Sequence, residues 1–146
     1  MQTVFDTGEI YNRGLTDPTA LSPDERLIYL IQEIECYSAM EGWDGFFRSP
    51  VAMPYYNELK DGLRMIQANA SLEVLIAYEQ EIIGLGFTVT NDGIDDMLAS
   101  DVFDALDPPH NYTDDWSKYS DELWELLREH LAPKEIVLRL HFSENP

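Results

Sequence analysis

The sequence predicts a mainly α-helical, single-domain bundle with one short extended segment near the C-terminus. Apolar residues recur at helical spacing in several stretches, and a strong helix-start signal precedes the longest of them. The stretch 136–142 instead alternates apolar and other residues, as a strand does. The chain has 146 residues, 45% of them hydrophobic, which is enough apolar material for one core. We therefore expect one domain over residues 1–146, with 1–20 and 133–146 as peripheral arms.

The clearest helix signal lies at the start of the stretch 23–41. Ser22 and Glu25 match a capping box, and Pro23 has the backbone angle favoured at the first helical position. The apolar residues that follow at helical spacing are Leu27, Ile28, Leu30, Ile31, Ile34 and Tyr37. The helix is expected to end at the turn 41–45, where two glycines bracket a Trp and an Asp.

Two further helices are predicted to form an antiparallel hairpin, because the link between them is short. The first begins near Pro54 and ends at Asn69. The second is capped by Ser71 and ends at Gly84. The expected inward residues are Tyr55, Leu59, Leu63 and Ile66 on the first helix, and Leu72, Leu75, Ile76, Ile82 and Ile83 on the second.

The last third of the chain contains weaker signals. The residues 91–93 indicate a turn, and two short helices follow, one with Ile94, Met97 and Leu98 and one with Val102, Phe103 and Leu106. Thr113 is expected to cap a final helix that ends near 132–133 and turns Trp116, Tyr119, Leu123, Leu126 and Leu127 inward. The strand over 136–142 needs a partner, which could be the N-terminal segment or a second copy; alternatively, it docks as an extended arm.

The charge is strongly negative and unevenly distributed. The chain has 28 Asp and Glu against 9 Lys and Arg, a formal net charge of −19. The 53 residues from Met65 to Ser117 include eleven acids and no Lys or Arg. One interpretation is a solvated face that only keeps the protein soluble. The other is a surface that binds a basic partner. Many like charges on one surface repel each other and destabilise the folded state, so their presence suggests a role in binding.

Twelve acidic residues are our candidates for a surface that binds a basic protein. Eight are aspartates between 92 and 115, and four continue along the final helix. Carboxylates four residues apart on a helix rise by roughly 6 Å, comparable with neighbouring phosphates on a nucleic-acid strand. The candidate residues are Asp92, Asp95, Asp96, Asp101, Asp104, Asp107, Asp114, Asp115, Asp121, Glu122, Glu125 and Glu129.

The sequence contains no recognisable motif for catalysis or cofactor binding. His110, His130 and His141 match no metal-binding spacing, and His130 suits a helix C-terminus as a cation. The lone Cys36 fits a small buried residue in a reducing compartment. The acids after Asp92 do not follow the EF-hand order. We therefore predict a non-enzyme with no catalytic residues, no cofactor and no resident metal.

Composition also limits partners and location. Phosphates would meet a strongly negative surface, which excludes direct nucleic-acid binding. No window approaches the ~18 apolar residues of a membrane span. The N-terminus lacks the basic start and apolar run of a secretory signal. A cytoplasmic protein without membrane contact is expected.

Aromatic residues surround the turn at 42–45. They are Trp43, Phe46, Phe47, Tyr55 and Tyr56. Core packing at a tight turn between helices is the favoured interpretation, and a hydrophobic anchor at an interface is the alternative.

These residues also carry a resemblance. The run 22–26, the helix through Ile34 and Glu35, the turn 41–47, and Tyr55-Tyr56 with Leu59 and Leu63 resemble a family of small acidic helical proteins. Its best-known member is a bacterial DNA mimic that binds a helix-turn-helix transcription regulator. The resemblance covers about residues 20–84. Much of the family has Asn-Gly-Gly at the turn, where this chain has Gly42-Trp43-Asp44-Gly45. The resemblance implies an all-helical fold, non-catalytic protein binding and a homodimer.

The sequence thus favours an acidic protein that occupies the nucleic-acid site of a basic DNA-binding protein. Two alternatives stay open. One is an immunity or antitoxin-like protein that neutralises a basic toxin or nuclease. The other is a protein that binds a divalent metal through clustered carboxylates.

Overall fold

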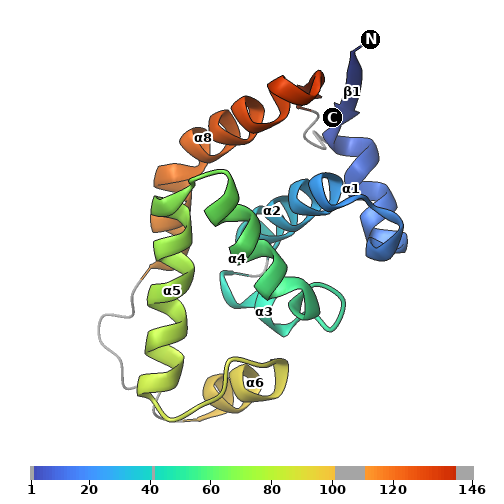
Figure 1. Ribbon diagram of the computed structural model, residues 1–146. Coiled ribbons are helices and arrows are strands. Elements are labelled where there is room, and N and C mark those ends of the chain that lie inside the picture. The colour runs from blue at the N-terminus through green and yellow to red at the C-terminus, as the bar shows by residue number, and fades with distance from the viewer. Residues whose placement is uncertain (1, 41, 101–110, 141–146) are drawn as a thin grey trace.

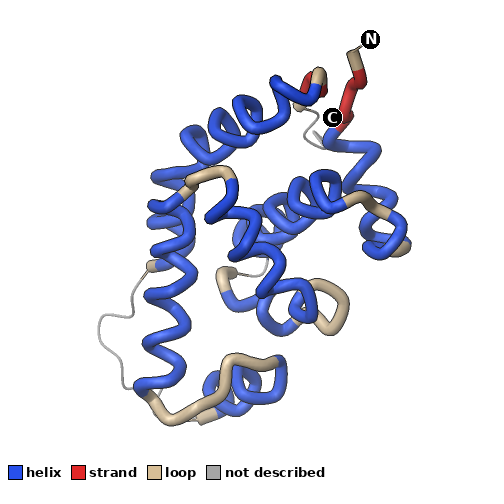
Figure 2. The backbone as a smooth tube through the Cα atoms, in the orientation of Figure 1, coloured by secondary structure: helices blue, strands red, loops and turns tan. Residues whose placement is uncertain are grey.

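The computed structural model describes residues 2–40, 42–100 and 111–140. Its helices are α1 (Thr7–Thr16), α2 (Pro23–Met40), α3 (Asp44–Arg48), α4 (Tyr56–Met65), α5 (Asn69–Gly84), α6 (Asn91–Ala99) and α8 (Tyr112–Leu131). Short 3₁₀ turns lie at Pro18–Ala20, Met53–Tyr55 and Ala132–Lys134. Two strands, β1 (Thr3–Asp6) and β2 (Ile136–Arg139), complete the fold. The predicted mainly α-helical fold is confirmed (Figures 1 and 2).

Helix α2 occupies the centre of the molecule. It packs against α1, α3 and α4 (Figure 1). Residues 27–31 are all buried, so this part of α2 has no exposed face. The predicted capping box begins the helix: Glu25 N–H donates to Ser22 Oγ, and Ser22 N–H donates to Glu25 Oε1 at 2.9 Å. Five of the six residues predicted to face inward on α2 are fully or almost fully buried, whereas Tyr37 is half-buried.

Helices α4 and α5 form the predicted antiparallel hairpin, but its turn differs from the prediction. The chain reverses at Gln67, which has a left-handed φ of 63°, and Ala68 N–H donates to Leu63 O. Helix α5 therefore begins at Asn69 without a side-chain cap, and Ser71 is buried inside its first turn. Ile83, expected to face inward, is 54% exposed.

The segment after α5 also departs from the predicted turn. Residues 91–93 form the first turn of α6, because Thr90 caps the helix by accepting a hydrogen bond from Gly93 N–H at 3.0 Å. Ile94 and Met97 face inward as predicted, and Leu98 is half-buried. The helix predicted around Val102, Phe103 and Leu106 lies outside the described residues.

The final helix and the terminal strand lie where the sequence predicts, but the residue that caps the helix differs from the prediction. Asn111, not Thr113, caps α8 by accepting from Asp114 N–H at 3.0 Å. Strand β2 pairs in parallel with β1, in the register Val4 to Val137. Three roles were open for this segment, and in the structure it pairs with the N-terminal segment (Figure 2). Across the described ranges, none of the helices combines the length and apolar character needed to cross a membrane.

Candidate protein-binding surface

Helix α8 has one buried and one acidic side. Its buried residues are Tyr112, Trp116, Leu123, Trp124, Leu127 and Leu131. The exposed acids on its opposite side are Asp114, Asp121, Glu122, Glu125 and Glu129. At 100° per residue these five acids fall within about a third of the helix circumference. From Asp114 to Glu129 the helix rises by 15 residue steps, so the row extends roughly 22 Å. We call these five residues the α8 acidic surface.

A single carboxylate on α2 binds the inner side of α8 and helps to orient this surface. Glu35 accepts hydrogen bonds from Trp116 Nε1 at 3.1 Å, Ser120 Oγ at 2.5 Å and Trp124 Nε1 at 3.0 Å. The three donors are four residues apart, so they lie on one side of α8. Their attachment to Glu35 leaves the acids of α8 on the outer side.

Helix α6 carries the second group of predicted acids. Asp92, Asp95 and Asp96 are all exposed, while Gly93, Ile94 and Met97 face inward. The helix docks on α3, with Asn91 Nδ2 donating to Phe47 O at 2.8 Å. Arg48 pairs with Asp95 at 2.8 Å. An acid in the first turn, Asp92, also suits the positive end of the helix dipole.

The two acidic helices lie at different places along α5. Helix α8 packs on α5, whereas α6 lies next to α3 beyond the other end of α5 (Figure 1). The twelve predicted residues therefore do not all gather on one helix face. Asp115 is half-buried. Asp101, Asp104 and Asp107 lie outside the described residues.

The basic residues are almost all used within the fold. The chain has nine Lys and Arg, and all nine are described. Eight form ion pairs with acids among the described residues: Arg13 with Glu9 and Glu25, Arg26 with Glu58, Arg48 with Asp95, Lys60 with Glu79, Arg64 with Asp61, Arg128 with Glu125, Lys134 with Asp24, and Arg139 with Asp6. Lys118 instead lies over the Tyr119 ring. Within the described ranges, Asp92, Asp96, Asp121, Glu122 and Glu129 have no ion pair.

Several other acids belong to the interior, a role that their sequence context did not reveal. Tyr78 donates to Asp44, Tyr112 donates to Glu81, and Tyr56 donates to Glu79 at 2.8 Å. Glu79 and Glu81 lie inside the acidic stretch 65–117, yet they face tyrosines. Burial raises the pKa of Asp44, against the hydrogen bond from Tyr78, which lowers it. Tyrosines and acids far apart in sequence give no local spacing by which such pairs could be recognised.

Glu33 is the most enclosed of these acids. Its side chain is 3% exposed and accepts from Tyr11 Oη at 2.6 Å and from Tyr29 Oη at 3.2 Å. Burial raises the pKa of Glu33 and outweighs the two hydrogen bonds, which lower it. The same burial raises the pKa of Tyr29.

The aromatic turn lies in the core, as its favoured interpretation predicts. Trp43 contacts the rings of Phe47, Tyr78, Tyr112 and Trp116, with centroids 5.5–6.0 Å apart. Phe46 and Phe47 are fully buried and Trp43 is 7% exposed. The turn therefore joins α3, α5 and α8.

Cys36 and His130 have no catalytic or metal-binding neighbours among the described residues. Cys36, expected to be buried, is partly exposed and its Sγ lies 3.6 Å from Met40 Sδ. His130 lies in the last turn of α8 and contacts Asp24 at 3.3 Å. Burial by itself raises the pKa of Asp24, but Lys134 and His130 hold it below its usual value. Among the residues the structure describes, no three His, Cys, Asp or Glu side chains form a metal-type cluster. His110 and His141 lie outside those residues.

Comparison with known proteins gives one result. No curated protein and no solved structure matches the chain. A family model described as DMP19-like protein matches residues 19–139. This match extends well beyond the resemblance over residues 20–84 and includes α6 and α8. Because it covers most of the sequence, the chain belongs to the DMP19-like protein family.

Proposed function

We propose that this protein is a non-catalytic, cytoplasmic binding protein whose α8 acidic surface occupies the nucleic-acid site of a basic protein. The observation that carries the proposal is the separation of charge. Five carboxylates lie on the outer side of α8, while eight of the nine basic side chains form ion pairs with acids in the part of the chain that the structure describes. A basic partner would therefore meet carboxylates that few internal bases neutralise.

The spacing of the carboxylates supports mimicry of a phosphate backbone. Asp121, Glu125 and Glu129 are four residues apart, so each rises roughly 6 Å above the last. Each carboxylate can accept two hydrogen bonds from an arginine fork, as a phosphate can. Lys and Arg side chains placed to contact consecutive phosphates would find acceptors at a similar interval on α8.

The partner class follows from the same chemistry and from the family resemblance. A basic DNA-binding protein presents Lys and Arg at the required spacing, and the resemblance implies a helix-turn-helix transcription regulator. The three exposed aspartates of α6 would add to the negative field that draws the partner in. Such a complex should form quickly and weaken with salt.

The test begins with capture of the partner and then uses two variants of equal charge. The protein is used as bait in lysate of the source organism, and bound proteins are eluted with salt and, separately, with duplex DNA. Binding of the recovered protein is then measured for Asp121→Asn/Glu122→Gln/Glu129→Gln. The control, Asp61→Asn/Glu73→Gln/Glu135→Gln, loses the same three charges from other exposed positions.

We expect the α8 variant to bind about tenfold more weakly or worse, with a shallower salt dependence, because three charge-assisted contacts are lost. The control should bind like the natural protein. Equal weakening of both variants would mean that net charge alone attracts basic proteins, which contradicts the proposal. Recovery of a toxin or nuclease that DNA does not displace would instead favour the immunity alternative.

A further inference from the structure

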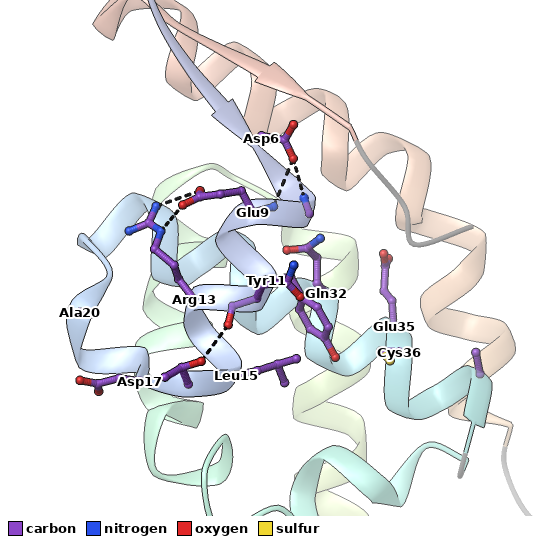
Figure 3. Close-up of a pocket in the computed structure, with 14 residues that line it drawn as sticks. Asp6, Glu9, Tyr11, Arg13, Leu15, Asp17, Ala20, Gln32, Glu35 and Cys36 are labelled. Carbon is purple, nitrogen blue, oxygen red and sulfur yellow. Dashed lines mark hydrogen bonds and ion pairs between the residues drawn. The ribbon is translucent and has the colours of Figure 1, made fainter. Parts of the chain in front are cut away.

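A groove of about 1400 Å³ lies between α1 and α2, apart from the α8 acidic surface. Figure 3 shows the side chains of both helices that line it. Helix α1 and the turn after it supply Tyr11, Leu15 and Ala20, and α2 supplies Cys36 and Ala39. These five residues make up the apolar lining, and Leu15 is 53% exposed. The groove is thus an accessible apolar surface between two helices.

The charged residues that line the groove are mostly acidic. Asp6, Glu9, Asp17 and Glu35 place four carboxylates in the lining. Arg13 is its one basic residue, and Glu9 and Glu25 both bind it at 2.5 Å. The formal charge of the lining is therefore +1 − 4 = −3. An apolar surface bordered by carboxylates complements a ligand that is apolar along one side and basic next to it.

The size of the groove indicates the form of that ligand. Small-molecule sites usually measure about 300–1,000 Å³, which is less than this groove offers. A groove between two helices is the geometry in which proteins bind an amphipathic helix through residues at i, i+3, i+4 and i+7. We propose that this groove binds an amphipathic helix of a partner protein, with an apolar stripe flanked by Lys and Arg.

This inference goes beyond the proposed function. Helix α1 precedes residue 19, so one side of the groove lies outside the part of the chain that the family model matches. No residue of the groove belongs to the α8 acidic surface. Loss of binding at one surface and not at the other would therefore separate the two proposals.

The test uses a defined peptide as the probe. A fluorescent helix of about 14 residues, near the shortest length that holds a helix, carries Leu at i, i+3, i+4 and i+7 and Lys elsewhere. A scrambled peptide of the same composition has the same charge without the stripe. Anisotropy is measured with the full chain at ~0.15 M salt, where exposed charges are screened beyond about 8 Å.

Matched variants locate the binding. Leu15→Asn removes an apolar side chain from the groove, and Met65→Asn removes one of equal 53% exposure elsewhere. Ala39→Trp fills the groove without changing charge. Circular dichroism verifies that each variant is folded. We expect the striped peptide to bind about tenfold more tightly than the scrambled one. Leu15→Asn and Ala39→Trp should each weaken binding about fivefold or more, and Met65→Asn should not.

Two results would overturn the inference. The first is equal binding of striped and scrambled peptides, or equal effects of Leu15→Asn and Met65→Asn, since either would mean general attraction to a basic peptide. The second comes from sedimentation of the protein alone. A dimer that Leu15→Asn and Ala39→Trp dissociate would assign the groove to a second copy of this chain instead.

Discussion

The carboxylate of Glu35 on α2 accepts the indole N–H of Trp124 on α8 at a distance of 3.0 Å. Trp116 and Ser120 donate to the same carboxylate, so three donors from successive turns of α8 share one acceptor group. The two indoles are almost completely buried, at 2% and 7% exposure. The central helix thereby fixes the rotation of α8 about its own axis, and with it the direction in which the α8 acidic surface points.

Replacing Glu35 by Ala should destabilise the protein by about 2–4 kcal/mol, because two buried indole N–H groups lose their acceptor. Glu35→Gln keeps one carbonyl acceptor and should cost less. The free energy of unfolding is measured by urea denaturation. Glu73, which is exposed on α5, provides the control, and Glu73→Ala should change stability by less than about 0.5 kcal/mol. Similar stability of Glu35→Ala and Glu73→Ala would show that the three-donor arrangement contributes nothing.

Gly93 is expected to tolerate no side chain. A Cβ at this position would lie 2.1 Å from Thr88 O, which is backbone and cannot move aside cheaply. Gly93→Ala should therefore destabilise the protein by about 1–3 kcal/mol and loosen α6 from α3.

A Cβ at Gly84, the last residue of α5, would have no neighbour within 4 Å. Gly84→Ala should be neutral or stabilising by up to ~1 kcal/mol. Thermal melting of the two variants gives the comparison, and equal melting temperatures would contradict it.

Local signals in the sequence predicted the helices well where a side chain itself defines the boundary. Ser22 and Glu25 satisfy each other's backbone N–H groups, so α2 begins where the capping box places it. The start of α5 has no such signal. Its boundary is set by Gln67, a non-glycine residue with a left-handed φ, and Asn69 and Ser71 suggested a turn that packing overrides. Likewise Thr90 draws residues 91–93 into α6, although their composition is typical of a turn.

The candidate site was only partly predictable for a different reason. Composition identified an excess of acid, and helical periodicity identified Trp116, Leu123 and Leu127 as inward residues of α8. Neither composition nor periodicity reveals which acids accept hydrogen bonds inside the fold. The tyrosine partners are distant in sequence: Glu81 accepts from Tyr112 across 31 residues, and Glu79 accepts from Tyr56 across 23. The groove between α1 and α2 likewise depends on how two helices pack against each other, which no local pattern in residues 7–40 encodes.

Glu33 should make stability fall as pH rises. Burial raises the pKa of this carboxyl in the folded protein, so the folded state binds its proton more tightly than the unfolded state. The resulting stabilisation is present below the ordinary value of 4.5 and is lost as pH rises through the raised value. Glu33→Gln does not titrate. The unfolding free energy of the natural protein minus that of Glu33→Gln should therefore decrease with increasing pH above 4.5. A constant difference across that range would contradict the prediction.

Asp24 should act in the opposite direction. Although burial alone raises its pKa, Lys134 and His130 lower it below the ordinary value of 3.8. Its contribution to stability is present above that value and is lost as pH falls through the lowered one. The natural protein should therefore lose stability relative to Asp24→Asn at acidic pH, as urea denaturation at several pH values would show. Opposite slopes for Glu33 and Asp24 in the same series would exclude a common effect of net charge.

Replacing Glu129 by Lys should stabilise the fold while weakening binding of a basic partner. Glu125 and Glu129 are like charges four residues apart, and the substitution converts them into a Glu-to-Lys pair in the favourable order. Lys in the last turns of α8 also suits the helix dipole. We expect the free energy of unfolding, measured by urea denaturation at low salt, to increase by roughly 0.5–1 kcal/mol. The increase should fade near 1 M salt as charges are screened.

Glu129→Gln, which removes the repulsion without adding an attraction, should increase the free energy of unfolding by about half as much. A stabilised variant that binds its partner as tightly as the natural protein would mean that Glu129 does not contribute to binding. Loss of binding together with higher stability would mean that these carboxylates are retained for the partner at the expense of the fold.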